Sequence, residues 1–567
     1  MGPAWTRSSA ALAGGLLALA CGTGLLSAQG RGAIEWTTAG SDAQRTGSIR
    51  SDPRISVESM QKPGAFGAFK FLWKLKLAHD PDAPAALTQP ILLDRLIGFR
   101  GFKSIAFVGT ASETVHAVDI DFGTTLWKYH INYSASPPPV PGLSAECPGG
   151  LTAAVSRPTP IAPSALGAGG GGGRGGRSGG GVGEPGQGAA TLATLGQARG
   201  GGAGAAGRGG AGARGAAPGT VPGSAAAAAG AAPGGLPGGA RAGGPGGPGG
   251  AFVPGADAAY VVGSDGYLHA LNVQNGWENM TPALFLPANT RASGLIVATA
   301  PDGAAIAYAA TTHGCGSQPD GVYAMDLGSE QKTVTSYQPK GATIAGTAGP
   351  AFGRDGTVYV TTRGGKSPLS GAVIALEPKT LKLKGSAAVP GISFSSSPLV
   401  IQAGDKDLLV AAAGGKVYLF DSGFLANGPI ATSAAFGSAD VEPGALTSWT
   451  DAQNARWIAV PSARGIVTFK LLEQAGTYAF APGWTSREMA SPVTPLVING
   501  VLFASSGGTR TAPAVLYALD AATGKELWSS MKSIASTVRG GLAGGQGNVY
   551  VPGTDGTLYA FGFAIEK

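Results

Sequence analysis

One short apolar phrase recurs eight times along this 567-residue chain, and the spacing of its copies is nearly constant. From Ala270 to Ala560 the copies follow one another at intervals of 42 to 54 residues. Self-similarity at such a period indicates a repeat architecture in which each unit is one supersecondary element. The copies are ETVHAVD (at Ala117), GYLHALN (Ala270), GVYAMD (Ala324), AVIALE (Ala375), KVYLFD (Leu419), IVTFK (Phe469), VLYALD (Ala518) and TLYAFG (Ala560).

Each copy follows a six- or seven-residue run, in most cases rich in Val, Tyr, Ile and Phe, that is too short for an independent helix. Asp-Gly pairs, as at Asp555-Gly556, supply the positive φ of tight hairpins. Units of this length built from strands predict an all-β fold, an eight-bladed β-propeller of four-stranded antiparallel blades. A β-sandwich or a string of small β domains is the alternative, and it does not explain the near-fixed period. The runs are IAFVGT (105–110), AYVVGS (259–264), AIAYAAT (305–311), TVYVTT (357–362), LLVAAA (408–413), RWIAVP (456–461), VLFASS (501–506) and NVYVPG (548–553).

The interval between Ala117 and Ala270 is longer because it contains residues 165–250, which are nearly all Gly, Ala and Pro with scattered Arg. Such a segment has too little apolar side chain to offset the entropy of ordering, so we expect a disordered insert. We therefore predict one propeller domain made of two parts. Residues 30–164 would hold the N-terminal closing strand and the first blade, and residues 251–567 the remaining blades.

The formal charge of +7 lies mostly in this insert, which has six arginines and one acid, Glu184. The rest of the chain is nearly neutral, whereas a nucleic-acid-binding domain places its charge on a folded face. The arginines are sparse and no aromatic residue is interleaved, which favours a solvated linker over an RNA-binding segment. We expect no nucleic-acid partner.

The first 29 residues have the layout of a secretory signal peptide, with Arg7, an apolar run and small residues before the predicted cleavage after Ala28 or Gln29. We expect an exported protein, periplasmic or extracellular, without a transmembrane helix. Cys21 follows the sequence LALA, a loose form of the box that precedes a lipid-modified cysteine, so a lipid anchor at Cys21 is an alternative fate of this segment.

Removal of the signal peptide leaves Cys147 and Cys315, which we predict to form a disulfide because oxidised cysteines persist outside the cytosol. His313 lies close to Cys315, but these ligands fall short of a tetrahedral metal set. A disulfide would pin the excursion Tyr133–Arg157 over the second and third units. That excursion is a candidate functional surface, with a purely structural clasp as the alternative.

The two ends of the chain predict how the ring closes. The last unit ends after TLYAFG without a tryptophan, whereas the run Phe69–Leu77 contains Trp73 and has no copy of the phrase before it. Because a propeller that does not close leaves an unpaired edge, we expect Phe69–Leu77 to complete the C-terminal blade.

The copy at Ala518, read on to Trp528, carries a family resemblance. Ala518, Asp520, Thr523, Gly524 and Trp528 resemble the tryptophan-docking motif of the pyrroloquinoline quinone (PQQ) type propellers, Ala-x-Asp-x-x-Thr-Gly-x-x-x-Trp. The resemblance implies packing between blades, which we predict for the residues that match the motif and for Trp73. The matching copies are Ala117, Asp119, Gly123 and Trp127, with Phe122 in place of Thr, and in part Ala270, Asn272 and Gly276, with Met280 in place of Trp.

The segment WTTAGSDAQRTG, Trp36–Gly47, is similar to the opening of quinoprotein dehydrogenases. Those enzymes use PQQ with bound Ca²⁺, a carboxylate or histidine base and often a vicinal disulfide. This chain has no Cys-Cys pair and no Cys-x-x-Cys-His haem motif. Its acids Asp80, Asp82, Asp94 and Glu113 match no calcium loop, so the resemblance supplies no catalytic residue.

Other members of the wider superfamily bind no cofactor and hold protein partners on their loops and blade edges. Short loops between the predicted strands favour this second kind, since oxidation of an alcohol needs a funnel walled by long insertions. We expect a non-catalytic scaffold that binds a protein or a cell-surface polymer, without cofactor. The alternative is a PQQ- and calcium-dependent oxidoreductase.

Overall fold

The computed structural model describes residues 35–64, 67–77, 85–98, 101–131, 147–161, 257–300, 303–438 and 442–564. All of them belong to one of the two units into which the chain divides, Met1–Gly170 with Phe252–Lys567. The predicted signal peptide, Cys21 and the predicted insert 165–250 lie outside the described residues.

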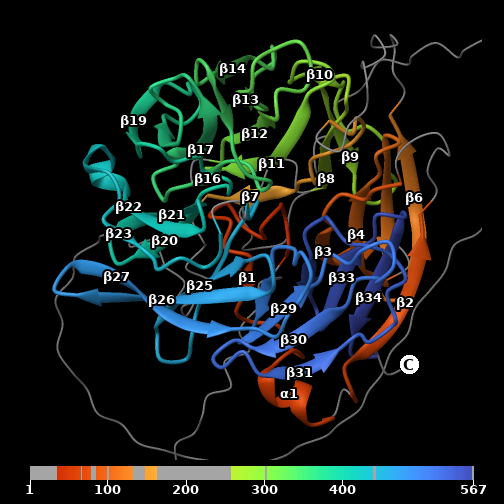
Figure 1. The fold of residues 1–567 in the computed structure, drawn as a ribbon. Coiled ribbons are helices and arrows are strands. Elements are labelled where there is room, and N and C mark those ends of the chain that lie inside the picture. The colour runs from red at the N-terminus through yellow and green to blue at the C-terminus, as the bar shows by residue number, and fades with distance from the viewer. Residues whose placement is uncertain are drawn as a thin grey trace, which may run out of the picture. The chain divides into compact units, whose positions relative to one another are not determined.

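The described part is almost entirely β-structure, as predicted, and Figure 1 shows its sheets arranged around the N-terminal segment. Three of the sheets have the expected four strands in chain order. They contain β3 (Ile91–Gly98), β4 (Gly101–Gly109), β5 (Thr114–Asp119) and β6 (Thr124–His130); β20 (Leu399–Ala403), β21 (Lys406–Ala413), β22 (Lys416–Asp421) and β23 (Ala431–Thr432); and β24 (Thr447–Thr450), β25 (Arg456–Pro461), β26 (Ile466–Gln474) and β27 (Thr477–Thr485).

Three further sheets have three to five strands, and two of them recruit a strand from the N-terminal region. They contain β8 (Ala258–Val262), β9 (Tyr267–Asn272) and β10 (Ala283–Leu284); β28 (Leu496–Ile498), β29 (Val501–Ser505), β30 (Leu516–Asp520) and β31 (Glu526–Ser529) with β1 (Ser48–Ile49); and β32 (Ala543–Gly545), β33 (Asn548–Pro552) and β34 (Thr557–Gly562) with β2 (Lys70–Lys76).

The remaining ten strands form one sheet instead of two separate blades. Its two antiparallel groups, β11–β14 and β16–β19, are joined because β15 pairs both with β17 and, through Thr312 and Ile344, with β12. The sheet contains β7 (Pro158–Pro160), β11 (Arg291–Thr299), β12 (Ala305–Thr312), β13 (Val322–Asp326), β14 (Val334–Tyr337), β15 (Ala342–Ile344), β16 (Ala351–Phe352), β17 (Val358–Gly365), β18 (Ala372–Leu376) and β19 (Leu383–Ala388).

All eight predicted hairpins are present. Each β-rich run forms a strand that pairs antiparallel with the strand of the phrase that follows it, as in β4 with β5 and β33 with β34. Strands of the phrase are buried on both faces, as in β5 and β34, because neighbouring sheets cover both sides.

The predicted closing strand is confirmed. β2 pairs antiparallel with β34, and Trp73 lies opposite Ala560. In the same register, Trp127 lies opposite Ala117 and Trp528 opposite Ala518. An alanine thus faces each of these indoles on the paired strand.

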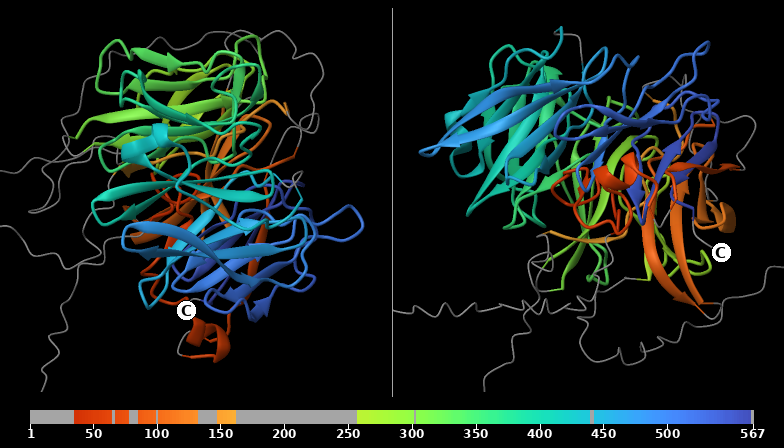
Figure 2. Two further views of the ribbon diagram at one scale, coloured as in Figure 1. Left: turned by 60° about the vertical axis from the view of Figure 1, so that its left-hand side comes forward. Right: turned by 90° about the horizontal axis from the view of Figure 1, so that it is seen from below.

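Helical structure is minor in the described residues. Helix α1 (Val57–Gln61) begins at Ser56, whose side chain and that of Ser59 form a capping box, and a 3₁₀ helix, η2, spans Ser422–Asn427. Figure 2 shows α1 at the periphery, with the long β26–β27 hairpin extending beyond the neighbouring strands. None of the described helices is long and apolar enough to span a membrane.

Candidate functional site

The N-terminal segment lies at the centre of the sheets and bonds to several of them in turn (Figure 1). Backbone N–H groups of four successive inner strands, β16, β20, β24 and β28, each donate to a carbonyl of this segment. Because these donors come from successive sheets, the segment ties the centre of the ring together. The bonds are Phe352 N–H to Ala43 O (2.9 Å), Val400 to Gln44 (3.0 Å), Ser448 to Thr46 (2.8 Å) and Val497 to Gly47 (3.0 Å).

Arg45 fixes this segment from the inside. Its guanidinium is 2% exposed and donates to the carbonyls of Pro350 (2.8 Å), Gly294 (2.9 Å) and Ala39 (2.5 Å). Burial lowers the pKa of Arg45 to about 9, and nearby Asp42 partly opposes that shift. With four of its five N–H groups bonded to protein oxygens, Arg45 acts chiefly as a structural cross-link.

A cavity of about 740 Å³ lies beside this segment. We call the end of the sheets at which its lining loops lie the funnel face. The lining is mostly Gly, Ala, Pro, Ser and Thr, so backbone groups dominate it. It comes from the N-terminal segment (36–47) and from residues 86–89, 111, 148–154, 291, 347–348, 438, 442–446, 461–463, 491–495 and 539–542.

Few charged side chains line the cavity, and two of them, Arg539 and Glu442, are hydrogen-bonded within the protein. Arg539 donates to the carbonyls of Gly507 (3.0 Å) and Val538 (3.1 Å), and Glu442 accepts from Arg363 (2.8 Å). Trp36 also lines the cavity, and its Nε1 is buried without a hydrogen-bond partner among the described residues. The described lining therefore offers a ligand mainly backbone groups and the side chains of Ser, Thr and Gln89, and it holds no acid–base pair.

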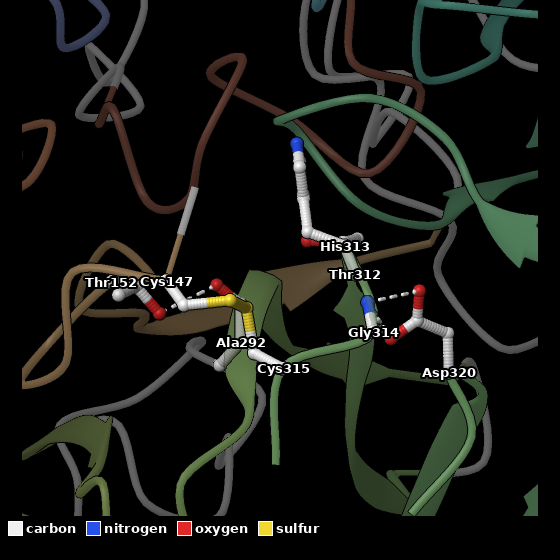
Figure 3. Close-up of a disulfide and its surroundings, with 8 residues drawn as sticks. All are labelled: Cys147, Thr152, Ala292, Thr312, His313, Gly314, Cys315 and Asp320. Atoms are coloured by element: carbon white, nitrogen blue, oxygen red, sulfur yellow. Dashed lines mark hydrogen bonds between the residues drawn. A yellow bond between two sulfur atoms is a disulfide. The ribbon is translucent and has the colours of Figure 1, made fainter. Parts of the chain in front are cut away.

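The structure joins Cys147 and Cys315 in a disulfide at the funnel face (Figure 3). The bridge connects Pro148 and Gly149, which line the cavity, to the turn between β12 and β13. Thr152 reinforces the connection by donating to the carbonyl of Ala292 (2.9 Å). The clasp thus anchors the C-terminal end of the predicted excursion, whose residues 133–146 lie outside the described part.

Asp320 holds the turn that carries Cys315. Both of its carboxylate oxygens accept from Gly314 N–H at 3.0 Å, and burial raises its pKa to about 6. In Figure 3 the His313 side chain points away from the disulfide, and its Nδ1 lies 3.0 Å from Thr312 Oγ1. No group of three or more His, Cys, Asp or Glu side chains that could hold a metal ion occurs in the described part of the chain.

The four acids considered for calcium do not gather at the cavity. Asp80 and Asp82 lie outside the described residues. Asp94 accepts from Ser104 Oγ (3.0 Å) and Gln546 Nε2 (2.8 Å), and neither it nor Glu113 lines the cavity.

The docked tryptophans lie between sheets, away from the cavity. Trp73 Nε1 donates to Ile120 O (3.1 Å) and Trp127 Nε1 to Val273 O (3.0 Å), each in the next sheet along the ring. Trp528 packs against Phe69, with ring centroids 4.9 Å apart. Each indole is thus opposite an alanine of the neighbouring strand, and those of Trp73 and Trp127 also reach the turn of the next sheet.

One docking residue was missed by the sequence analysis. Trp484 of β27 donates from Nε1 to Ala521 O (3.0 Å), within the turn that Asp520 and Gly524 form. The signal was available, since GWT at 483–485 ends the last strand of the preceding unit. Its spacing hides it, because the β26–β27 hairpin is longer than that of the motif, so Trp484 follows Phe469 by 15 residues instead of 10.

The comparisons with known proteins agree with this geometry. A family model described as outer membrane protein assembly factor BamB matches residues 512–564. Residues 512–564 form a PQQ-type propeller repeat. No curated protein matches the sequence.

Two solved structures resemble this chain in fold over nearly its whole length. A europium-containing methanol dehydrogenase is 11% identical, with a TM-score of 0.53 over 93% of this chain and 98% of that one. A quinohemoprotein alcohol dehydrogenase from Pseudomonas putida is also 11% identical, with a TM-score of 0.51 over 94% of this chain and 81% of that one. At this identity the likeness shows a shared β-propeller fold.

The residues around the cavity do not fit PQQ with a divalent ion. The described cavity lining has one carboxylate, Glu442, which is exposed and paired with Arg363, and it has no histidine. Calcium takes six to eight oxygen ligands, in most sites including several carboxylates. The disulfide joins distant loops instead of adjacent residues.

Proposed function

We propose that the protein is an exported, non-catalytic PQQ-type propeller of eight blades whose funnel face binds a partner protein. The signal-like residues 1–29 support export to the periplasm or cell exterior. The ten-stranded sheet has two antiparallel groups of four strands, which supports counting it as two blades joined by β15. Residues 30–164 and 251–567 would share this domain, with 165–250 as a disordered insert.

One observation carries the non-catalytic assignment. The centre of the ring is filled by the N-terminal segment, and the cavity beside it is lined by small residues and backbone, with its one described carboxylate already paired. The matching family model supports a protein partner over a surface polymer, since its description names an assembly factor for proteins. A lipid anchor at Cys21 remains a separate proposal for how the chain is held.

A second candidate is a PQQ- and calcium-dependent oxidoreductase, favoured by the fold shared with a europium-containing methanol dehydrogenase over 93% of this chain. Two different activities on one fold are common, so this likeness does not decide the matter. The donor set of the cavity argues against it.

The two candidates are separated by adding PQQ and Ca²⁺ to the purified mature chain. We expect no bound quinone absorbance and no reduction of an artificial electron acceptor with alcohols or sugars. Quinone absorbance together with acceptor reduction would refute the scaffold assignment.

A further inference from the structure

Two ends of each sheet can be distinguished by topology. In an antiparallel four-stranded sheet, the turn between the second and third strands lies at the same end as the connection to the next sheet. At the funnel face these are the loops 462–465, 486–495, 506–515 and 530–542 of the arc from β24 to β34. The turns between the first and second and between the third and fourth strands lie at the opposite end, which we call the turn face.

Cations dominate this arc of the funnel face. We define the basic arc as Arg464, Arg510, Lys532 and Arg539, all of them exposed. The side chains of the first three have no hydrogen-bond or ion-pair partner among the described residues. The side chain of Arg539 is bonded to backbone carbonyls at the cavity wall. The described acids of this arc are fewer, because Glu488 is the one exposed there and Asp555 is half-buried beside Lys76, while Glu442 before β24 is paired with Arg363.

The arc borders the cavity directly. Ser462 and Ala463 line the cavity next to Arg464, and Gly540 lines it next to Arg539. The three sheets that supply these loops are neighbours, since β24 packs beside β28 and β28 beside β32. A ligand lying in the cavity mouth would therefore meet positive charge from three adjoining sheets.

The turn face has the opposite character. Among the described residues, exposed acids there outnumber exposed cations, and two of those cations, Arg354 and Lys406, are paired with Asp407 and Asp421. The exposed acids include Asp121, Asp257, Glu330, Glu377, Asp405 and Glu473. The molecule thus presents one basic and one acidic end, and complementary charge steers association and fixes orientation.

We propose that the basic arc docks an acidic polypeptide segment of the partner, laid across the cavity mouth. This rests on the proposed function and specifies the partner's chemistry. Met531 supplies an apolar contact within the arc, because its side chain is 73% exposed next to Lys532. Backbone groups in the Gly- and Pro-rich lining suit hydrogen bonding to an extended peptide.

A single-stranded nucleic acid would fit this arc less well. Such ligands are held by aromatic side chains on which successive bases stack. None of the exposed large hydrophobic side chains in the loops of the described arc is aromatic, since Met531 is the one found there. The exposed aromatic residues Phe122, Trp277 and Phe424 belong to turns at the opposite end.

The test compares two triple variants of the full mature chain. Arg464→Gln/Arg510→Gln/Lys532→Gln neutralises the arc, and Lys379→Gln/Lys382→Gln/Lys525→Gln removes three exposed charges from the turn face. Both variants keep the six insert arginines, so any difference between them isolates the arc from the insert. The probe is a fluorescein-labelled peptide of alternating Glu and Ala, followed by fluorescence anisotropy.

We expect the arc variant to bind this peptide about tenfold more weakly than the unmodified chain, the size expected for three exposed charge pairs. The turn-face variant should stay within about twofold, and added salt should weaken binding by the unmodified chain because exposed charges are screened beyond about 8–10 Å. Equal losses in the two variants would overturn the proposal.

Three further outcomes would overturn it in distinguishable ways. Equal affinity for a peptide of alternating Gln and Ala would leave the scaffold function standing but remove the preference for acids. Tighter binding of a labelled oligouridine would assign the arc to nucleic acid. Self-association in sedimentation without peptide, lost in the arc variant, would make a second copy the occupant, its acidic turn face seated on the basic arc.

Discussion

At the scale of single residues, three glycines decide where the tryptophans dock. Gly123, Gly276 and Gly524 all have left-handed backbone, with φ of 64°, 75° and 74°. A Cβ added at any of them would lie within 2.5 to 2.6 Å of an indole carbon. Two conditions thus require glycine at this position of the motif: the left-handed backbone of the turn and the close approach of the indole that covers it.

We predict that Gly524→Ala destabilises the protein by about 2–4 kcal/mol, because a left-handed alanine costs about 1–2 kcal/mol and displacing Trp484 adds about 1–3. Gly476→Ala is the matched control, since Gly476 has φ of 79° but no atom within 4 Å of its added Cβ. The control should show the backbone cost alone in urea unfolding. Equal losses in the two variants would contradict the docking role of Gly524.

Asp320 makes stability depend on pH. Burial raises its pKa to about 6 from the ordinary 3.8, so protonation favours the folded state. Its contribution is therefore fully present below about pH 4 and is lost as pH rises through about 6, on the order of 2–3 kcal/mol in total. Asp320→Asn should remove this dependence, because an amide oxygen can still accept from Gly314 N–H.

The measurement is urea unfolding at about pH 4 and about pH 8, where the advantage of Asp320→Asn over the unmodified chain should grow toward the higher pH. Glu330→Gln, at an exposed acid, is the control and should leave the difference between the two pH values unchanged. An advantage that shrinks on going to about pH 8 would show that ionised Asp320 is stabilising.

At the scale of elements, β2 closes the sheet of the last repeat. Its lysines Lys70, Lys74 and Lys76 are exposed, which discourages pairing of this outer strand with another molecule. The long outer strand β27 has no lysine but contains Pro482, which lacks the N–H that a further strand would need. Without β2, the edge of β34 would have neither protection.

We predict that a chain starting at Ala78 is oligomeric or insoluble, whereas one starting at Gly64 keeps β2 and stays soluble. Both lack the central segment, so the difference between them isolates the closing strand. Size-exclusion chromatography with light scattering distinguishes the two. A monomeric chain starting at Ala78 with unchanged thermal stability would refute the closure of the ring by β2.

The sequence was informative about elements where local pattern decides the structure. All eight hairpins, the strand Phe69–Leu77 and the alanine opposite each predicted tryptophan follow from periodicity and turn residues. The fusion of two predicted blades through Thr312 and Ile344 could not be foreseen, because it depends on one pairing between the ends of β12 and β15 that no local pattern marks. Trp484 was missed because the longer β26–β27 hairpin changes its spacing from the phrase.

The cavity was beyond prediction for a related reason. Its lining comes from short, unremarkable loops of many repeats, so no local motif marks it. Trp36 and Arg45 were seen in the sequence only as part of an opening similar to quinoprotein dehydrogenases. Arg45 is held at the centre by the carbonyls of Pro350 and Gly294, which lie 305 and 249 residues away.

At the scale of the whole molecule, the central segment links sheets that are otherwise joined only to their neighbours. Residues 43–47 accept hydrogen bonds from four successive inner strands, so loss of the segment affects several sheets at once. We expect the ring to unfold as one cooperative unit for this reason.

We predict that a chain starting at Gly64 unfolds at lower urea concentration than one starting at Glu35, and that its transitions by tryptophan fluorescence and circular dichroism no longer coincide. Arg45→Met is a finer test, because it leaves several buried carbonyls without their donor and should cost about 3–5 kcal/mol. Coincident, unshifted transitions in both variants would show that the sheets do not need the segment.

The pairing of β2 with β34 also has a consequence for biosynthesis. Lys70–Lys76 leave the ribosome nearly five hundred residues before Thr557–Gly562. Likewise, the carbonyls of Ala43, Gln44, Thr46 and Gly47 are synthesised long before their N–H donors, which lie between Phe352 and Val497. Contacts of such sequence separation form late and slowly. The closing pair can therefore form only after Thr557–Gly562 have left the ribosome, and a chain carried across a membrane before that point would arrive there still open.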